Sequence, residues 1–215
     1  MGILLRPQQD ILRDSTRLMF ITTETEYRAQ INLLIRQANV CGLGSRESIP
    51  IDVRAIIRAA DSARRPLSLN EIEHICAIRK TSEKAVVELI EKSPKMIVEA
   101  RTSLLRRQPA LIAQGGELFP KHRAEACWRD CEQFIRVVTY GVACNCTVIT
   151  DKAGMKALLE LYMILGVPVK ALLYVLAELK NLSVNRLRRS GYERESACAQ
   201  GAFDDLICAL SPKSE

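Results

Sequence analysis

Beyond residue 50, apolar residues recur at spacings of three, four and seven, which is the periodicity of helices that bury one face. The pattern is densest from Ala124 to Val142, a stretch without proline in which the single glycine, Gly141, comes near the end. A central helix is therefore predicted there. Segments with the same periodicity lie on both sides of it, and further helices are predicted over 51–63, 69–79, 82–92, 94–105, 150–165, 169–180 and 199–210.

Proline, glycine and polar runs mark the predicted ends of these helices. The sequence Arg64-Arg-Pro66 ends the first, because proline disfavours helix at the residue before it. Ser93-Pro94 has the form of an N-cap followed by proline at the first helical position, so a new helix is expected to begin there. Loops are expected over 108–120, 144–146 and 185–192. The count is roughly eight or nine helices, which suits a globin-like packing.

Residues 1–49 are predicted to be an N-terminal extension, and residues 50–215 the main domain. Thr23-Glu-Thr-Glu26 predicts a capping box. One amphipathic helix follows and ends before Gly42. Its apolar stripe consists of Tyr27, Ile31, Leu34, Ile35 and Ala38. Such a helix packs either on its own domain or on a partner, and the sequence leaves both alternatives open.

Composition favours an all-α protein. Hydrophobic residues make up 48% of the chain, which is enough for a packed core, while aromatic residues make up only 5% and glycine and proline are sparse. The net charge of +6 permits an acidic partner without identifying one. Charged residues and a proline interrupt the most apolar region, 157–179, so no transmembrane segment is expected. With no signal peptide predicted, the eight cysteines are expected to be free thiols in a reducing compartment.

The predicted central helix carries an unusual group of polar side chains on one side. Positions three and four apart are neighbours on a helix, and these spacings bring together Arg123, Cys127, Asp130, Cys131 and Phe134. A thiol, a carboxylate and a guanidinium thus lie within about two turns of a mostly apolar helix.

The motif Cys127-Trp-Arg-Asp130, followed by the segment from Phe134 to Gly141, resembles the chromophore-bearing helix of the phycobiliproteins, allophycocyanin subunits most of all. Supporting pieces occur in the order typical of that family: a Gly115-Gly116 loop, Leu165-Gly-Val-Pro-Val169 and Ala202-Phe-Asp204. The similarity covers residues 50–212 and leaves the N-terminal extension outside.

The resemblance implies a globin-like phycobiliprotein fold and a bound linear tetrapyrrole, or bilin. It assigns Cys127 the thioether to the pigment and Asp130 a charge-assisted contact with the central pyrrole nitrogens. Arg129 would pair with one propionate and Arg123 with the other. Helix geometry places Arg129 about 200° round from Cys127, so Arg129 would have to reach its propionate from the flank.

The resemblance also implies the pigment, the partners and the location. Phe134 and Tyr140 would complete the pigment groove, and phycocyanobilin, one per chain, is the expected pigment. The chain would be a light-harvesting subunit that transfers excitation energy and has no enzymatic activity. It would pair with an unlike phycobiliprotein subunit, close a ring of three pairs, and contact phycobilisome linker proteins. This assembly would sit peripherally on the cytoplasmic or stromal face of the thylakoid membrane. The alternative is a pigment-free family member for antenna assembly, linkage or turnover.

The same residues also allow simpler interpretations. Cys127 could be a small buried hydrophobe. The cysteines with His122 could suggest a metal site, but they lack paired Cys-x-x-Cys spacing, so none is expected. The basic run 186–189 could bind nucleic acid, but such runs are usually solvated faces, and no nucleic-acid partner is expected. Finally, the two short helices over 51–79 are expected to leave an apolar patch exposed for pairing, unless the extension covers it.

Overall fold

The computed structural model describes residues 24–211, and all regular elements within this range are helical. The only strand-like pairing there is one isolated antiparallel bridge between Cys41 and Thr150. The expected all-α class is therefore confirmed for this part of the chain. Thr23, the predicted start of the capping box, lies outside the described residues.

Eight α-helices and two 3-10 helices make up the described chain. In order they are the N-terminal helix (residues 24–37), η1 (Leu43–Ser45), α2 (Ile51–Ser62), α3 (Leu69–Arg79), α4 (Glu83–Arg107), η2 (Pro109–Ile112), α5 (Lys121–Ala143), α6 (Lys152–Leu165), α7 (Val169–Arg189) and α8 (Glu193–Leu210). Across residues 24–211, none of the helices combines the length and the apolar character needed to cross a membrane.

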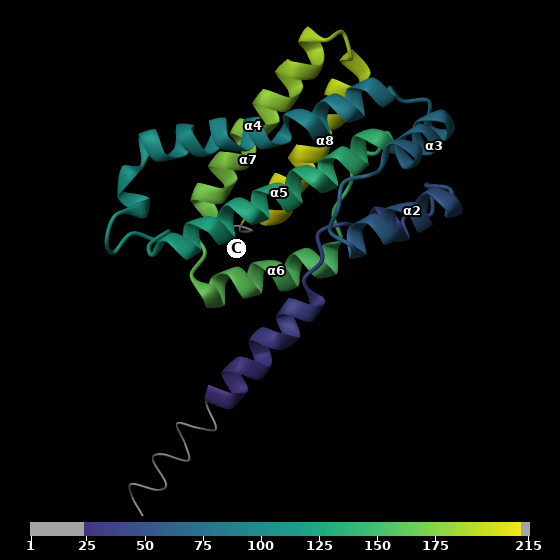
Figure 1. The fold of residues 1–215 in the computed structure, drawn as a ribbon. Coiled ribbons are helices and arrows are strands. Elements are labelled where there is room, and N and C mark those ends of the chain that lie inside the picture. The colour runs from purple at the N-terminus through teal and green to yellow at the C-terminus, as the bar shows by residue number, and fades with distance from the viewer. Residues whose placement is uncertain (1–23, 212–215) are drawn as a thin grey trace, which may run out of the picture.

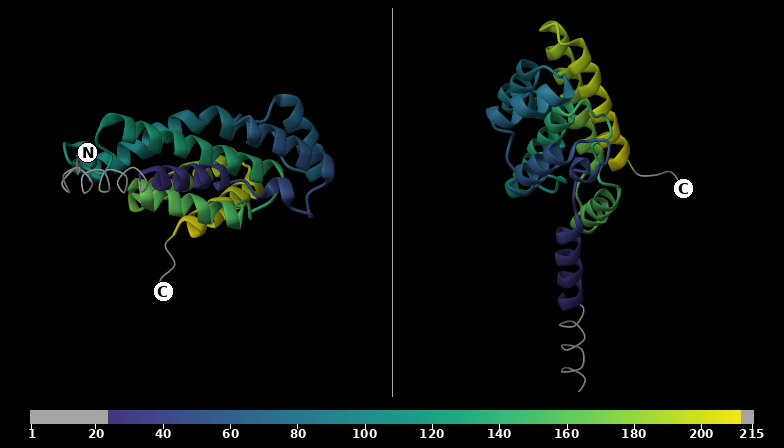
Figure 2. Two further views of the ribbon diagram at one scale, coloured as in Figure 1. Left: turned by 90° about the horizontal axis from the view of Figure 1, so that it is seen from below. Right: turned by 90° about the vertical axis from the view of Figure 1, so that its right-hand side faces the viewer.

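Helix α5 lies at the centre of the molecule and packs against α3, α4, α7 and α8 (Figure 1). Helices α7 and α8 pack together as a pair that crosses behind α4 and α5. The N-terminal helix projects from the body on the side of α6, as Figure 1 and the right-hand view of Figure 2 show. Its first residues, 24–30, are all exposed. The central helix predicted over 124–142 is thus present and a few residues longer.

The prediction that a new helix begins at Pro94 is wrong, because α4 runs through this residue without a break. Proline has no N–H, so the carbonyl of Ile90, four residues earlier, loses its helical donor. The Ser93 hydroxyl donates to that same carbonyl at 2.9 Å. Pro94 is also exposed, so its ring takes no place in the core. The side chain that looked like an N-cap instead satisfies the acceptor that proline leaves free.

The predicted loop over 185–192 is also wrong in its first half, because α7 continues to Arg189. The polar and basic residues there alternate with Val184 and Leu187, which are buried. Arg186 pairs with Glu88 of α4, which fixes the last turn. Helix α8 likewise begins six residues before the predicted start at 199, where the carboxylate of Glu195 accepts from the backbone N–H of Ser82 at 2.8 Å.

The apolar patch expected on α2 and α3 is largely absent, because most of its residues are buried. Val53, Ile57, Ile72 and Ile75 are at most 2% exposed. The segment 43–49 covers α2: Leu43 and Ile49 join the main core, and the Arg58 guanidinium donates to the Gly44 carbonyl at 2.8 Å. The exposed large apolar side chains that remain on these two helices are Ile51, Leu69 and Ile78.

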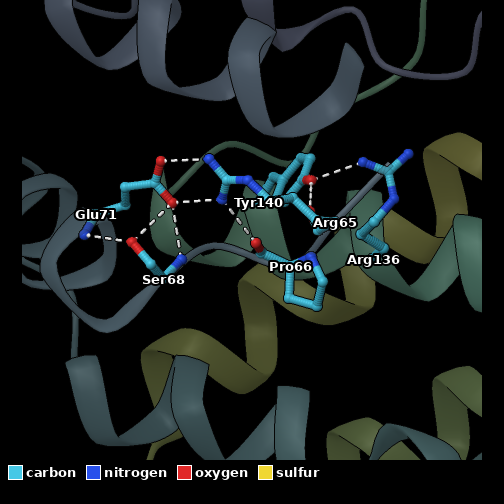
Figure 3. Close-up of polar contacts among 6 residues, drawn as sticks. All are labelled: Arg65, Pro66, Ser68, Glu71, Arg136 and Tyr140. Carbon is cyan, nitrogen blue, oxygen red and sulfur yellow. Dashed lines mark hydrogen bonds and ion pairs between the residues drawn. The ribbon is translucent and has the colours of Figure 1, made fainter. Parts of the chain in front are cut away.

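A polar network joins the start of α3 to the buried half of α5 (Figure 3). The Glu71 carboxylate accepts two bonds of 2.7 Å from the Arg65 guanidinium and a third of 2.7 Å from the backbone N–H of Ser68, the N-cap residue of α3. The backbone carbonyl of Arg65 accepts from the Tyr140 hydroxyl, which in turn accepts from Arg136 at 2.6 Å. The contact with Arg65 is the main cause that lowers the pKa of Glu71 to about 2. Burial opposes this shift, and the hydrogen bonds from Ser68 add to it. The network therefore holds the α2–α3 connection against α5.

Glu71→Gln should lower the free energy of unfolding at neutral pH by about 1–2 kcal/mol, because an amide cannot form the paired contact with Arg65. The ordinary Glu pKa is 4.5 and the folded value is about 2, so the stabilisation is complete above pH 4.5. It should decline as the pH falls and disappear near pH 2. Urea unfolding between pH 2 and 7 measures this difference.

The matched control is Glu73→Gln, on the same helix and exposed, with no ion pair among the described residues. It should leave the free energy of unfolding unchanged. A pH-independent difference between the wild type and Glu71→Gln would contradict the assigned role of the ion pair.

Candidate functional site

The N-terminal half of α5 faces two cavities that lie beside α6. The smaller cavity, of about 210 Å³, is bounded by α5 and the residues that follow α6. The larger, of about 560 Å³, lies between α5, α6 and the end of the N-terminal helix. Asp130 lines both cavities, so its carboxylate stands where the two spaces meet.

Cys127 and Arg123 line the smaller cavity together with apolar side chains at the end of α6 and just after it, Leu165, Val167 and Pro168. The Arg123 guanidinium donates to the carbonyl of Glu117 at 3.0 Å and to those of Leu165 and Gly166 at 3.1 and 2.7 Å. These carbonyls belong to the end of α6 and to the loop before α5. Arg123 therefore clamps the cavity walls together.

The larger cavity has an apolar side and a cationic side. Phe134, Leu158 and Leu161 line the apolar side, and Phe134 is only 1% exposed. The cations on the lining are Arg36, Arg64 and Arg136. Arg136 is engaged in an ion pair with Asp61 at 2.8 Å. Within residues 24–211, the guanidinium groups of Arg36 and Arg64 have neither an ion pair nor a hydrogen bond.

Asp130 is a half-buried carboxylate without an ion pair inside the described chain. Its one hydrogen bond there comes from the Tyr162 hydroxyl of α6, at 2.8 Å. Burial raises the pKa of Asp130, and the Tyr162 hydroxyl, with the charges of Arg129 and Arg64, opposes that rise. Burial and the nearby carboxylate also raise the pKa of Tyr162, so its hydroxyl remains the donor. A carboxylate in this setting favours a cationic or N–H-donating ligand.

Cys127 and Cys131 are one turn apart, but only Cys127 faces a cavity. Cys131 is fully buried and lines neither of the two cavities. The neighbouring Cys127 thiol, and then burial, raise the pKa of Cys131 well above its usual value. Cys131 therefore stays a protonated thiol in the core, and Cys127 is the thiol that a ligand in the cavity can meet.

The structure brings together most, but not all, of the site residues expected from the sequence. Cys127, Arg123 and Asp130 share the smaller cavity, and Phe134 joins Asp130 in the larger one. Arg129 is exposed and lines neither cavity, as its position on the helix suggested. Tyr140 is fully buried and belongs to the network of Figure 3. It lies about 15 Å beyond Asp130 along α5, given a rise of about 1.5 Å per residue.

Sequence reasoning did not single out three residues of the site. Tyr162 and Arg36 were not predicted to belong to the site, and Arg64 served only to mark the end of the first predicted helix. The α6 pattern places Leu158, Leu161 and Tyr162 on one face, which was a usable signal for Tyr162. Nothing in the local pattern indicated that the extension would reach the α5–α6 gap.

The arrangement suits a long ligand that is tethered at one point. A ligand bound at Cys127 would pass Asp130 and continue into the larger cavity. There it could contact the apolar side chains and the unpaired guanidinium groups of Arg36 and Arg64. The two volumes together fall in the range of roughly 300–1,000 Å³ typical of small-molecule sites. Within 24–211 no group of three or more His, Cys, Asp or Glu side chains is placed to hold a metal ion.

Comparison with known proteins gives a family and several relatives. The sequence model of the family described as "Phycobilisome protein" matches residues 55–210. Allophycocyanin subunit alpha-B of Nostoc sp. is 30% identical over 161 residues, which cover 74% of this chain and 97% of the relative. C-phycocyanin-3 beta subunit of Microchaete diplosiphon is 30% identical over 165 residues, covering 73% and 95%. Allophycocyanin alpha chain 2 of the same organism is 28% identical over 158 residues, covering 72% and 95%.

The isolation of Asp130 from any cation pair has a measurable consequence for the ligand-free chain. Because folding raises the pKa of this group, its charged form opposes folding at neutral pH. Asp130→Asn removes that charge and keeps an oxygen for the Tyr162 hydroxyl, so it should increase the free energy of unfolding. The increase should shrink as the pH falls towards 3.8, the ordinary Asp value.

Asp61→Asn is the matched comparison, since Asp61 pairs with Arg136, whose side chain is 9% exposed. This change should instead lower the free energy of unfolding by about 1–3 kcal/mol. Urea unfolding at pH 4 and 7 tests both variants. A loss of stability in Asp130→Asn comparable to that in Asp61→Asn would contradict the description of Asp130 as unpaired.

Proposed function

The chain belongs to the phycobilisome protein family, and from that premise we propose that it is a light-harvesting subunit that holds one linear tetrapyrrole. Family members have the globin-like all-α fold and are pigment proteins of the light-harvesting antenna, not enzymes. The finer proposals are covalent attachment at Cys127, phycocyanobilin as the pigment, one pigment per chain, and transfer of excitation energy to neighbouring pigments.

The observation that carries the proposal is the half-buried Asp130 carboxylate beside a cavity-facing thiol. A bilin has a central group of pyrrole nitrogens, two propionates and a long conjugated body, and each part has a counterpart on these walls. Asp130 would accept hydrogen bonds from the pyrrole N–H groups and favour their protonated form. Tyr162 would hold the Asp130 carboxylate in place by donating to its other side. The bound pigment supplies the visible absorption that an antenna subunit needs.

Attachment at Cys127 requires only that its sulfur add to a carbon–carbon double bond at the edge of the pigment. The new bond is a carbon–sulfur bond, and the thiol proton passes to the neighbouring carbon, so no oxidant is consumed. The clamp formed by Arg123 keeps the α6–α7 connection over Cys127. Two of the three guanidinium nitrogens of Arg123 already donate to carbonyls, so its main role is to hold the wall of the site in place. A propionate would accept from the remaining guanidinium N–H groups.

Phe134 would lie against the pigment's conjugated face, and Arg129 would reach a propionate from the solvent side. Tyr140 would act indirectly, since it fixes the half of α5 that follows the site. It is therefore proposed as a positioning residue and not as a pigment contact.

The same premise extends to the partners. We expect pairing with an unlike phycobiliprotein subunit, closure of three pairs into a ring, linker contacts and a peripheral location on the cytoplasmic or stromal face of the thylakoid membrane. Ile51 and Leu69, 72% and 71% exposed, are the apolar groups of α2 and α3 that a partner would cover.

Cys127→Ser should abolish covalent pigment in cells that make phycocyanobilin, while Cys131→Ser should retain it. Both changes are small, so the fold should persist in each. Zinc-enhanced fluorescence of the denatured protein band reads out covalent attachment. Pigment that survives denaturation in Cys127→Ser would exclude Cys127, and a wild-type band without pigment would favour the pigment-free alternative.

Replacing both Ile51 and Leu69 by Lys should weaken pairing with an allophycocyanin subunit by roughly tenfold or more, because two charges would be desolvated at the contact. Sedimentation of the mixed subunits measures the association. Met163→Lys, on α6, is the matched control, since Met163 is also 71% exposed. Equal association of the double variant and the control would remove α2 and α3 from the proposed interface.

A further inference from the structure

The N-terminal extension lies outside the family-matched region, yet its last residues are fixed against the start of α6. The backbone N–H of Gly42 donates to the Ile149 carbonyl at 2.7 Å, and the N–H of Asp151 donates to the Val40 carbonyl at 3.0 Å. These bonds flank the bridge between Cys41 and Thr150. The segment 38–42 is therefore held in one register beside residues 149–151.

Gly154 makes this close approach possible. A Cβ added there would lie 2.7 Å from the backbone nitrogen of Asn39 and closer still to its carbonyl oxygen. Gly42 is equally crowded by the backbone of Thr150. No larger residue fits at either position without moving a backbone segment, so segment 38–42 and the start of α6 approach each other closely on both sides.

The preceding turns of the N-terminal helix pack on α6. Leu34 is 5% exposed and forms a small separate core with Ala157 and Leu161 of α6. Partly buried Ile31 and Ile164 complete this cluster. The end of the N-terminal helix is thus held at two places, by the backbone bonds of 38–42 and by Leu34.

This placement makes the extension a wall of the larger cavity. Ile35, Arg36, Ala38, Asn39 and Val40 line the same space as Asp130, Phe134 and Tyr162. The Arg36 guanidinium has no carboxylate or hydrogen-bond partner among the described residues. By contrast Arg28, two turns earlier on the same helix, pairs with Glu24 at 2.8 Å and does not line the cavity.

We infer that residues 31–40 close the pigment pocket and that Arg36 binds a carboxylate of the pigment. The identity of that ligand rests on the proposed function, and the geometry points to a propionate because the cavity runs from Asp130 to an unpaired guanidinium. Arg36 would hold the end of the pigment remote from Cys127. The extension would thus position the pigment from within the same chain.

The test uses the full-length chain carrying Cys127→Ser, so that binding is reversible. Biliverdin and its dimethyl ester, which lacks both carboxylate charges, are each titrated by fluorescence or absorbance. The ratio of their dissociation constants measures the contribution of the carboxylates. Arg36→Gln should reduce the preference for the free acid about two- to fivefold, the range for a partly exposed ion pair. Arg28→Gln removes the same charge from the same helix and should leave the ratio unchanged.

Hydrogen exchange supplies a second readout that does not depend on the spectrum. Bound biliverdin should slow the exchange of backbone amides in 31–40 in the parent chain, and less so in Arg36→Gln. The inference would be overturned if the ratio of the two dissociation constants were the same in Arg36→Gln as in Arg28→Gln. It would also be overturned if bound biliverdin left the exchange rates of the amides in 31–40 unchanged. Equal binding of acid and ester by the parent would also overturn it and leave the proposed function standing. Binding of neither compound would refute both.

Discussion

The burial of the C-terminal half of α5 is the constraint on which the other helices depend. Residues 137–144 are all buried, so this part of the helix is enclosed by its neighbours on every side. Its polar side chains must then find partners inside the protein. The Thr139 hydroxyl donates to the carbonyl of Arg136 at 2.7 Å, and the Tyr140 hydroxyl donates to that of Arg65. The second bond fixes the α2–α3 connection, and Arg136 extends the constraint to Asp61 of α2.

The N-terminal half of α5 meets a different environment, and that difference creates the site. On one side Trp128 is buried, with the Arg101 guanidinium of α4 5.2 Å from the centre of its ring. On the other side α6 is tied to α5 by two polar links, from Tyr162 to Asp130 and from Arg123 to the end of α6. Space remains between these links, and the cavities occupy it. A half-buried charge without a pair weakens the fold. The ligand proposed above would supply the missing donors at this position.

The sequence predicted well whatever depends on local periodicity. Helix α3 was placed correctly at both ends, and α2 within one residue, because Pro50, Arg64-Arg-Pro66 and a clear apolar stripe delimit them. Cys127, Asp130 and Phe134 line the two neighbouring cavities, and their spacing alone puts them on one side of a helix, whereas Cys131 of the same predicted group lines neither cavity. Local rules failed at Pro94, where the Ser93 hydroxyl compensates for the missing N–H. They also failed at 185–189, where the burial of Leu187 keeps the segment helical although its neighbours in the sequence are polar.

The remaining part of the site could not be predicted, since it depends on which segments meet. Tyr162 is 32 residues from Asp130, and no sequence period connects them. The burial of the apolar patch on α2 was equally unpredictable from local periodicity, because the segment 43–49 covers the patch through Leu43 and Ile49. Tyr140 was expected in the groove because it follows the motif on the same helix, but its position along α5 places it beyond the cavities.

The extension and the family-matched domain are mechanically coupled through Gly154. This glycine lies in the first turn of α6, and Asp151, the N-cap residue of the helix, accepts from its N–H at 2.6 Å. The same turn therefore does two things: it starts the helix that carries Leu161 and Tyr162 to the cavity, and it admits the backbone of Asn39 at close range. A displacement of segment 38–42 would move the start of α6, and with it the hydroxyl that holds Asp130. Residues 38–40 line the larger cavity as α6 does, and Cys41 and Gly42 hold them in place, although all five residues precede the matched region in the sequence.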